Sequence, residues 1–448
     1  MVMKMLSVVI NKIEKMPNVR VKLKAFMPLI GLFLFIAISN HSNVQQMNVV
    51  ETQAYLKNAV KKAYAASVRI WGFDVERNER TSAQFSGVVV SEKGIILTAA
   101  HTISPGRTYK IFFPDGREVI AKALGRIDLE TAPGTPDAGM MQILDKGSFP
   151  FVEMGFSASL KVNEACISIS YPERINLTLP TLRYGKIAEV KNEYGFIRST
   201  CKMEPGDSGG PLFDQLGRLI GIHSAIDVNE EMNFEIPIDV YRKYWTALQE
   251  QKNYTTYPTQ TDSFSKSSSD SFSKIWDLDV PIDRFASRLI KKNNNAFLLT
   301  SKLEGVDIEA TGTVINYVEN EVKKQFVVSK NSIVGDLPYL LVDDEKVLLE
   351  VVKRDNWLRG DQTFSKSIKL MNRPFIPSKH PVDRFIGGSS ERRDGYKQVF
   401  THDAVLTPSQ CGSPIFGVDG EFLGINIARY SRAVSLGIPC AAIIELLK

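Results

Sequence analysis

Three short segments carry side chains that could act together on a carbonyl carbon. His101 ends the segment Leu-Thr-Ala-Ala-His, Asp137 begins Asp-Ala-Gly-Met-Met-Gln-Ile, and Ser208 lies in the glycine-rich Glu-Pro-Gly-Asp-Ser-Gly-Gly-Pro. A serine hydroxyl is a weak nucleophile at its ordinary pKa and needs an imidazole base that a carboxylate holds in one tautomer. The backbone N–H groups of Gly206 and Ser208 are candidate donors to an oxyanion, since glycine permits the tight turn. The three segments predict acyl transfer by an activated serine.

The carboxylate of this set has a competitor. Asp128, in Gly-Arg-Ile-Asp, also lies between the histidine and serine segments, and a solvated loop carboxylate is the simpler interpretation of either residue. We prefer Asp137 because the small and apolar residues after it predict a buried strand beside the cleft. A structural histidine and a turn serine are the simpler interpretations of His101 and Ser208, but both residues stand in full motifs.

The segments that would position these residues have the pattern of short strands. From about residue 65, apolar runs such as Ser-Val-Arg-Ile-Trp alternate with turns, which predicts an all-β sandwich or barrel. Residues 238–251 change to a helical period and predict one amphipathic closing helix. A stretch rich in Ser and Thr then predicts a flexible linker over 251–274, after which the strand pattern resumes.

The second half of the chain repeats the first in weakened form. Pro-Gly-Asp-Ser-Gly-Gly-Pro-Leu-Phe at 205–213 has a counterpart in Pro-Ser-Gln-Cys-Gly-Ser-Pro-Ile-Phe at 408–416, and two further glycines recur at the same spacing of 203 residues. This agreement predicts an internal duplication. The alignment puts Asn331 opposite His101 and Cys411 opposite Ser208, so the second copy loses its general base.

The order of His101, Asp137 and Ser208, with the motifs around them, resembles the chymotrypsin-fold serine peptidases and most closely their HtrA/Deg-like branch. The segments Gly-Ile-His-Ser and Ile-Pro-Ile-Asp are further hallmarks, and the resemblance covers residues 60–250. It implies two six-stranded barrels with the triad in the cleft between them, His101 being the base, Asp137 its orienting carboxylate and Ser208 the nucleophile. We therefore expect an all-β chain of two tandem trypsin-like double β-barrel domains, the second shortened and degenerate.

Residues near the serine bear on specificity. By the resemblance, Gly-Ile-His-Ser-Ala-Ile lines the substrate strand, so His223, Ser224 and Ile226 are predicted to bind substrate. His223 has the spacing from the serine that glutamyl endopeptidases share, although Met203 replaces their small hydroxyl residue, and a packed strand residue is the simpler interpretation. By the resemblance, Asp207 stands at the position that binds the newly cut N-terminus in trypsin-like zymogens. No activation site precedes the first strand, so a structural hydrogen-bonding role is the alternative.

The cysteine of the second copy leaves another alternative open. Gln-Cys-Gly-Ser-Pro around Cys411 resembles the nucleophile turn of viral chymotrypsin-fold cysteine peptidases. A thiol would still need a base, for which His380 and His402 are candidates outside any recognisable motif. We favour a pseudoenzyme, in which Cys411 is a small buried residue or a partner of Cys440.

The N-terminus carries an export signal. Six lysines and arginines precede a 15-residue apolar run at 25–39, which is shorter than a membrane span of ~20 residues and typical of a signal peptide. We therefore divide the chain into a signal peptide or membrane anchor (1–39), an active peptidase domain (50–250), the linker (251–274) and a pseudopeptidase domain (275–448). The exported part is periplasmic or secreted, or held at the membrane if the segment is not cleaved.

Composition excludes several other functions. Lys and Arg total 55 and Asp and Glu total 50, and a net charge of +5 over 448 residues is too small for a nucleic-acid-binding protein. No P-loop, dinucleotide fingerprint or zinc-type spacing occurs, so we expect neither cofactor nor metal. Four cysteines are too few for a disulfide scaffold, although Cys166 and Cys201, on strands flanking one barrel, could pair.

We therefore predict an exported serine endopeptidase that cleaves protein or peptide substrates through an acyl-enzyme on Ser208. The alternative from another class is a non-catalytic binding or chaperone-like protein built from two peptidase-fold domains. The sequence leaves the natural substrate and the oligomeric state open.

Overall fold

The computed structural model describes residues 49–129, 136–173 and 179–264 and, with gaps of one or two residues, 296–349 and 388–447. These residues belong to one compact unit of the chain. The predicted signal segment 1–39, the linker residues 265–274, Asn331 and His380 lie outside the described residues. None of the helices in the described part is long and apolar enough to cross a membrane.

The first barrel is a six-stranded antiparallel sheet that closes on itself. Its strands run in the order β5-β4-β1-β2-β3-β6, and β6 pairs back onto β5. Apolar side chains from alternate strand positions fill its interior, as small barrels require. The strands are β1 (Ser67–Asp74), β2 (Glu79–Val89), β3 (Ile95–Ala99), β4 (Thr108–Phe112), β5 (Glu118–Asp128) and β6 (Asp137–Ile143).

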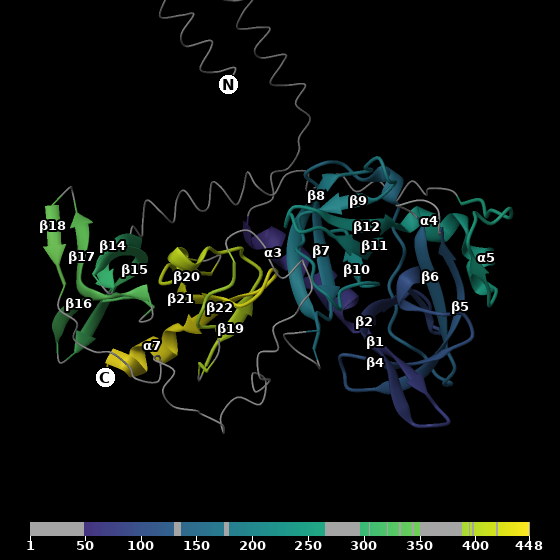
Figure 1. Ribbon diagram of the computed structural model, residues 1–448, viewed down its shortest axis with the longest axis horizontal. Coiled ribbons are helices and arrows are strands. Elements are labelled where there is room, and N and C mark those ends of the chain that lie inside the picture. The colour runs from purple at the N-terminus through teal and green to yellow at the C-terminus, as the bar shows by residue number, and fades with distance from the viewer. Residues whose placement is uncertain are drawn as a thin grey trace, which may run out of the picture. The chain divides into compact units, whose positions relative to one another are not determined.

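The second barrel is also closed and six-stranded, in the order β10-β11-β12-β9-β8-β7 (Figure 1). The two closed barrels confirm the double-barrel fold expected for the first domain. The strands are β7 (Ala165–Ser170), β8 (Thr181–Glu189), β9 (Ile197–Ser199), β10 (Pro211–Phe213), β11 (Leu219–Ile226) and β12 (Asn233–Pro237).

Helices flank the barrels at both ends of this domain. Helix α3 (Val49–Ala66), which the strand-based analysis did not predict, precedes β1 and buries alanines of its last turns in the core. The single helix predicted over 238–251 is instead two, α4 (Ile238–Lys243) and α5 (Trp245–Gln249). Tyr244 separates them because its backbone, with φ −115° and ψ 26°, leaves the helical region. The strand β13 (Asn253–Tyr254) then pairs with β5, so the predicted linker begins with ordered structure.

In its described part the second half forms a five-stranded and a four-stranded sheet (Figure 1). One sheet has the order β16-β15-β14-β17-β18, and the other has the order β19-β22-β21-β20. The first contains β14 (Ala296–Leu303), β15 (Val306–Glu319), β16 (Val322–Val328), β17 (Asp336–Val342) and β18 (Glu345–Leu348). The second contains β19 (Phe400–His402), β20 (Pro414–Phe416), β21 (Phe422–Arg429) and β22 (Ser435–Pro439), and α7 (Cys440–Leu447) follows it.

The strands after the two nucleophile-like turns pair in the same register. In the first half Pro211 faces Ile222 across β10 and β11, with a bulge after Leu212. In the second half Pro414 faces Ile425 across β20 and β21, with a bulge at the equivalent place. Each of these positions differs by 203 residues between the halves, and the next strand and helix follow in both. A repeated bulge is a specific backbone feature, so this agreement supports the predicted duplication.

Candidate active site

The structure brings His101 and Asp137 into direct contact at the end of the first barrel. His101 lies in a 3₁₀ turn directly after β3, and Asp137 is the first residue of β6, which pairs with β3. The His101 backbone N–H donates to Asp137 Oδ1 over 2.9 Å, and ring atom Nδ1 lies 2.8 Å from Oδ2. A third group, the Ser224 hydroxyl, donates to the same Oδ2 over 2.6 Å. Asp137 therefore fixes the ring, while Asp128 lies beside Arg126 at 3.9 Å.

This contact sets the protonation of the imidazole. Because ionised Asp137 can only accept, Nδ1 carries a hydrogen and Nε2 is left as the basic nitrogen. Burial alone lowers the pKa of His101, but the hydrogen bond and charge of Asp137 outweigh it, and the net pKa is raised above 6.5. The ring stays 46% exposed whereas the Asp137 side chain is 13% exposed, so the base faces outward and its partner is shielded.

The turn that carries Ser208 requires glycine on both sides. Gly206 has φ +99° and Gly209 has φ +80°, a region that side chains with a Cβ disfavour. A Cβ on Gly209 would lie 2.0 Å from the hydroxyl oxygen of Thr98, three residues before His101. The nucleophile turn therefore packs directly against the end of the strand that positions the base.

Hydrogen bonds anchor the carbonyl groups of Gly206 and Ser208 in this turn. The Ser86 backbone N–H donates to Ser208 O over 2.9 Å, and the Ser86 hydroxyl donates to Gly206 O over 2.8 Å. Neither Gly206 N–H nor Ser208 N–H donates to another described residue. Two such N–H groups, separated by one residue, are the arrangement that stabilises a developing oxyanion.

Strand β11 connects the serine turn to the histidine–carboxylate pair. The Gly209 N–H donates to His223 O over 2.8 Å, and the His223 N–H donates to Gly210 O over 2.7 Å. The next residue, Ser224, is the one that donates to Asp137. Within the described residues Ser208 Oγ makes no hydrogen bond to the imidazole, a looseness common in unliganded sites.

Asp207 is bound by an internal cation. Its Oδ2 lies 2.9 Å from Arg183 Nη1 on β8, and both side chains are 1% exposed. The Glu204 N–H donates to the same Oδ2 over 2.7 Å, and the Ser170 hydroxyl donates to Oδ1 over 2.7 Å. Asp207 therefore has the structural hydrogen-bonding role that the sequence left as an alternative, and Arg183 supplies a charge that sequence reasoning missed.

Of the three predicted substrate-binding residues, His223 does not lie on the surface of the cleft. Its ring is fully buried, and Nε2 lies 2.6 Å from the Ser168 hydroxyl inside the second barrel. Burial, with a smaller effect of Arg183, lowers its pKa to about 3, so the ring is neutral at physiological pH. This environment fits the packed strand residue and argues against direct contact with an acidic substrate side chain. Ser224 and Ile226 are partly exposed.

All four cysteines are free. The sulfur atoms of Cys166 and Cys201 lie 3.9 Å apart in the second barrel, and both residues are buried. Cys411 is also buried, 3.7 Å from the Ser390 hydroxyl, and burial raises the pKa of its thiol despite the opposing charge of Lys330. In the described part of the chain no imidazole hydrogen-bonds to Cys411. Among the described residues, the thiol therefore has no base of the kind that the cysteine-peptidase alternative requires.

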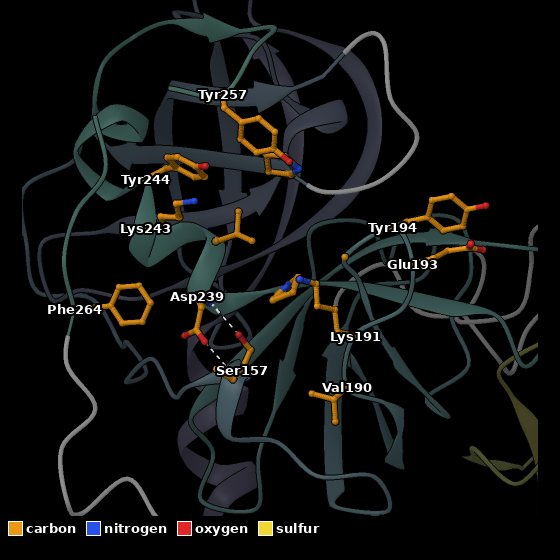
Figure 2. Close-up of a pocket in the computed structure, with 15 residues that line it drawn as sticks. Ser157, Val190, Lys191, Glu193, Tyr194, Asp239, Lys243, Tyr244, Tyr257 and Phe264 are labelled. Atoms are coloured by element: carbon orange, nitrogen blue, oxygen red, sulfur yellow. Dashed lines mark hydrogen bonds between the residues drawn. The ribbon is translucent and has the colours of Figure 1, made fainter. Parts of the chain in front are cut away.

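A cavity of about 560 Å³ is lined in part by residues of α4. Figure 2 shows Asp239 and Lys243 of this helix among the lining residues. Pro136, next to Asp137, forms part of its wall, whereas His101 and Ser208 do not. Asp239 is held there by the Ala158 N–H over 2.8 Å. Across the described ranges, no group of three or more His, Cys, Asp or Glu side chains could hold a metal ion. The aromatic and charged lining includes Tyr194, Tyr244, Tyr257, Phe264, Lys191 and Lys243.

Part of the chain is similar to known proteins. Residues 85–222 match the family model described as trypsin-like peptidase domain. Among curated proteins, serine protease HTRA1 of Xenopus laevis is 30% identical over 200 residues, which are 42% of this chain and 42% of that protein. The probable periplasmic serine endoprotease DegP-like of Bartonella henselae is 31% identical over 147 residues, which are 32% of this chain and 27% of that protein.

The matches cover only part of this chain and only part of each relative. The chain spans less than half the length of these curated relatives. A solved HtrA-type protease, AlgW, with a tripeptide, is 25% identical with a TM-score of 0.37, and the match covers 44% of this chain and 64% of that chain. The curated relatives support an HtrA/Deg-like serine peptidase domain in the first half.

Proposed function

We propose that this chain is an exported serine endopeptidase that hydrolyses peptide bonds of protein substrates through an acyl-enzyme on Ser208. One observation carries the proposal. The Asp137–His101 pair is joined by two hydrogen bonds, and strand β11 links it to a serine turn with two free N–H groups. A nucleophile, a base held in one tautomer and oxyanion donors are the three parts that peptide-bond cleavage needs.

The proposed reaction uses each group once in each half-reaction. Nε2 of His101 takes the hydroxyl proton as Ser208 Oγ bonds to the carbonyl carbon, and the N–H groups of Gly206 and Ser208 bind the oxyanion. When the C–N bond breaks, His101 returns the proton to the leaving amine, and the acyl-enzyme remains. Water then attacks the ester with the same base, which restores the hydroxyl and releases the new carboxyl end. Asp137 stabilises the imidazolium in both steps.

The second half is proposed to be a shortened copy that lacks catalysis. Its β20–β21 register repeats that of β10–β11, which supports the duplication. Cys411 takes the position of Ser208, but it is buried, and burial raises the pKa of its thiol. A buried neutral thiol is a poor nucleophile, so we propose a non-catalytic role for this half.

Export rests on the sequence of the first 39 residues and on the relatives. The basic segment and 15-residue apolar run have the pattern of a signal peptide. One matching relative is named a probable periplasmic serine endoprotease. We propose that cleavage or anchoring of this segment places the peptidase domain outside the cytoplasm.

A fluorophosphonate probe tests the nucleophile directly, because it forms a bond only with an activated serine. The full chain should be labelled on Ser208, and Ser208→Ala should abolish both labelling and peptide hydrolysis. Ser148→Ala, which removes an exposed hydroxyl elsewhere in the domain, is the control and should keep both. An unlabelled wild-type protein would favour the non-catalytic alternative. Proteolysis that survives in Ser208→Ala and is blocked by iodoacetamide would instead assign activity to Cys411.

A further inference from the structure

The turn between β21 and β22 of the second half contacts the peptidase domain beside its nucleophile. We call residues 429–433 the clamp segment. The guanidinium of Arg432 donates to two backbone carbonyls of the β11–β12 turn, from Nη1 to Asp227 O over 2.5 Å and from Nη2 to Asn229 O over 3.0 Å. Arg432 is 3% exposed, so these bonds form away from water.

A buried ion pair lies next to these bonds. Arg429 Nη2 pairs with the carboxylate of Glu230, and the two residues are 2% and 7% exposed. Arg429 also donates to the carbonyls of Leu406 and Arg432, so much of its hydrogen-bonding capacity is used. A buried charge is tolerated only when it is paired and hydrogen-bonded, and here each partner comes from a different half of the chain.

The clamp segment also reaches the nucleophile turn itself. The Ala433 N–H donates to Glu204 Oε1 over 2.9 Å. The Glu204 backbone N–H in turn donates to Asp207 Oδ2 over 2.7 Å, and the Asp207 N–H donates to Glu204 O over 3.0 Å. Asp207 directly precedes Ser208. The second half is therefore linked to Asp207 through Glu204 by two successive hydrogen bonds.

The two contacted segments of the peptidase domain are tied to each other. Asn233 Nδ2 donates to Glu230 O over 2.8 Å, and its Oδ1 accepts the Met203 N–H over 3.0 Å. Lys202 Nζ also donates to Glu230 O over 3.0 Å. A displacement of the β11–β12 turn is therefore transmitted to residues 202–204, and from there to the oxyanion donors.

A further contact joins the second half to strand β8 of the peptidase domain. Asp403, after β19, accepts the backbone N–H of Tyr184 over 2.6 Å. Tyr184 follows Arg183, whose guanidinium pairs with Asp207. The second half of the chain thus touches both the strand that supplies the buried cation and the turn that supplies Glu204.

We propose that the clamp segment is a positioning element that holds the nucleophile turn and the β11–β12 turn of the peptidase site in their reactive arrangement. The proposal rests on the function proposed for Ser208 and assigns Glu204, Arg429 and Arg432 as positioning residues. In this proposal the second half contributes support to the peptidase domain through the clamp segment, which follows β21 as the β11–β12 turn follows β11. Small displacements of oxyanion donors are costly, since about 1 Å of misplacement reduces rates by up to about 100-fold.

The test uses the full chain with Arg432→Ala, Arg432→Lys and, as matched control, Lys302→Ala, which removes an exposed cation of the second half. Two readouts are measured: the rate of fluorophosphonate labelling together with kcat for a peptide, and hydrogen exchange of the amides in 200–212 and 226–234. We expect Arg432→Ala to lower labelling and kcat by about 10- to 100-fold and to raise exchange in both segments. Arg432→Lys should recover part of both, and Lys302→Ala should match the wild type.

Hydrogen exchange separates this proposal from the function on which it rests. If the wild type is not labelled on Ser208, the proposed function fails, while faster exchange in Arg432→Ala still supports the positioning contact. Unchanged exchange and unchanged kcat in Arg432→Ala overturn the proposal. Faster exchange across all of 67–250 would mean that the substitution unfolds the domain generally. Arg432→Lys then decides the question. If this variant unfolds like the wild type but does not recover kcat, the proposal is overturned.

Discussion

Substitution of Arg183 by Met should show how far the nucleophile turn depends on one buried ion pair. Arg183 Nη1 lies 2.9 Å from Asp207 Oδ2, and each side chain is 1% exposed. Met retains much of the apolar stem but removes the cation, which leaves a carboxylate buried without its countercharge. Breaking a buried pair in this way costs about 3–5 kcal/mol of the free energy of unfolding.

The structure places the expected loss near the lower end of that range. Asp207 keeps two hydrogen bonds, from the Ser170 hydroxyl over 2.7 Å and from the Glu204 N–H over 2.7 Å, and these partly stabilise its charge. We therefore expect Arg183→Met to lose about 3 kcal/mol, a large part of a typical total of about 5–15 kcal/mol. The double variant with Asp207→Asn removes both charges and should recover at least half of this loss, because no unpaired charge then remains buried.

Urea unfolding followed by tryptophan fluorescence measures the stability of the four members of this double-mutant cycle. Fluorophosphonate labelling measures whether the turn still supports an activated serine. The control is Arg117→Met, since Arg117 and Asp115 form an exposed pair at 2.8 Å that should contribute at most about 1 kcal/mol. A loss below about 1 kcal/mol in Arg183→Met, or strict additivity in the double variant, would refute the reasoning.

Three further predictions follow from the same geometry. Asp137→Asn should lower the hydrolysis rate by about 10⁴-fold and move the acid limb of its pH profile downward, because the carboxylate raises the His101 pKa and the neutral ring is the active form; an unmoved limb would contradict this. Ser224→Ala removes one donor to Asp137 and should lower kcat by about tenfold with KM nearly unchanged, as steady-state kinetics will report. The His223 ring is neutral in the native state down to about pH 3 but becomes protonated below about pH 6.5 in the unfolded chain, so the free energy of unfolding decreases as the pH is lowered between these values. In urea unfolding, His223→Gln should reduce this pH dependence by about 1.4 kcal/mol per pH unit between pH 6 and 4. Equal pH dependence in the variant and the wild type would exclude this role of His223.

Local motifs made much of the first half predictable. The strands around His101 and Ser208 follow from alternating apolar residues between turn signals, and the glycines of the nucleophile turn have the positive φ angles that their positions imply. Ser224 directly follows His223, whose backbone N–H donates to Gly210 beside Ser208. A hydroxyl one residue beyond the point where a strand meets the serine turn is a candidate partner for the other site residues. The assignment of Ser224 as a substrate-binding residue overlooked that a hydroxyl there also reaches Asp137.

The remaining features depend on contacts that no local pattern encodes. Arg183 is one of 55 basic residues, and only the pairing of β7 with β8 brings it to Asp207. Helix α3 is weakly amphipathic and is defined by its packing against the core through Ala59, Ala63 and Ala66. The break at Tyr244 is likewise set by tertiary packing, since the apolar period runs through it. The position of Arg183, the presence of helix α3 and the break at Tyr244 therefore depend on contacts between residues distant in the sequence.

The clamp segment depends on charges from both halves of the chain. Arg429 is the last residue of β21, at the position that Ile226 occupies in β11, and both residues lie beyond the same bulge. In the first half this position holds the partly exposed Ile226, whereas in the second half the guanidinium of Arg429 pairs with Glu230. A buried cation without that carboxylate, or the carboxylate without the cation, would destabilise the fold by several kcal/mol. The buried Arg429 cation is therefore stable only because the β11–β12 turn of the first half carries its countercharge.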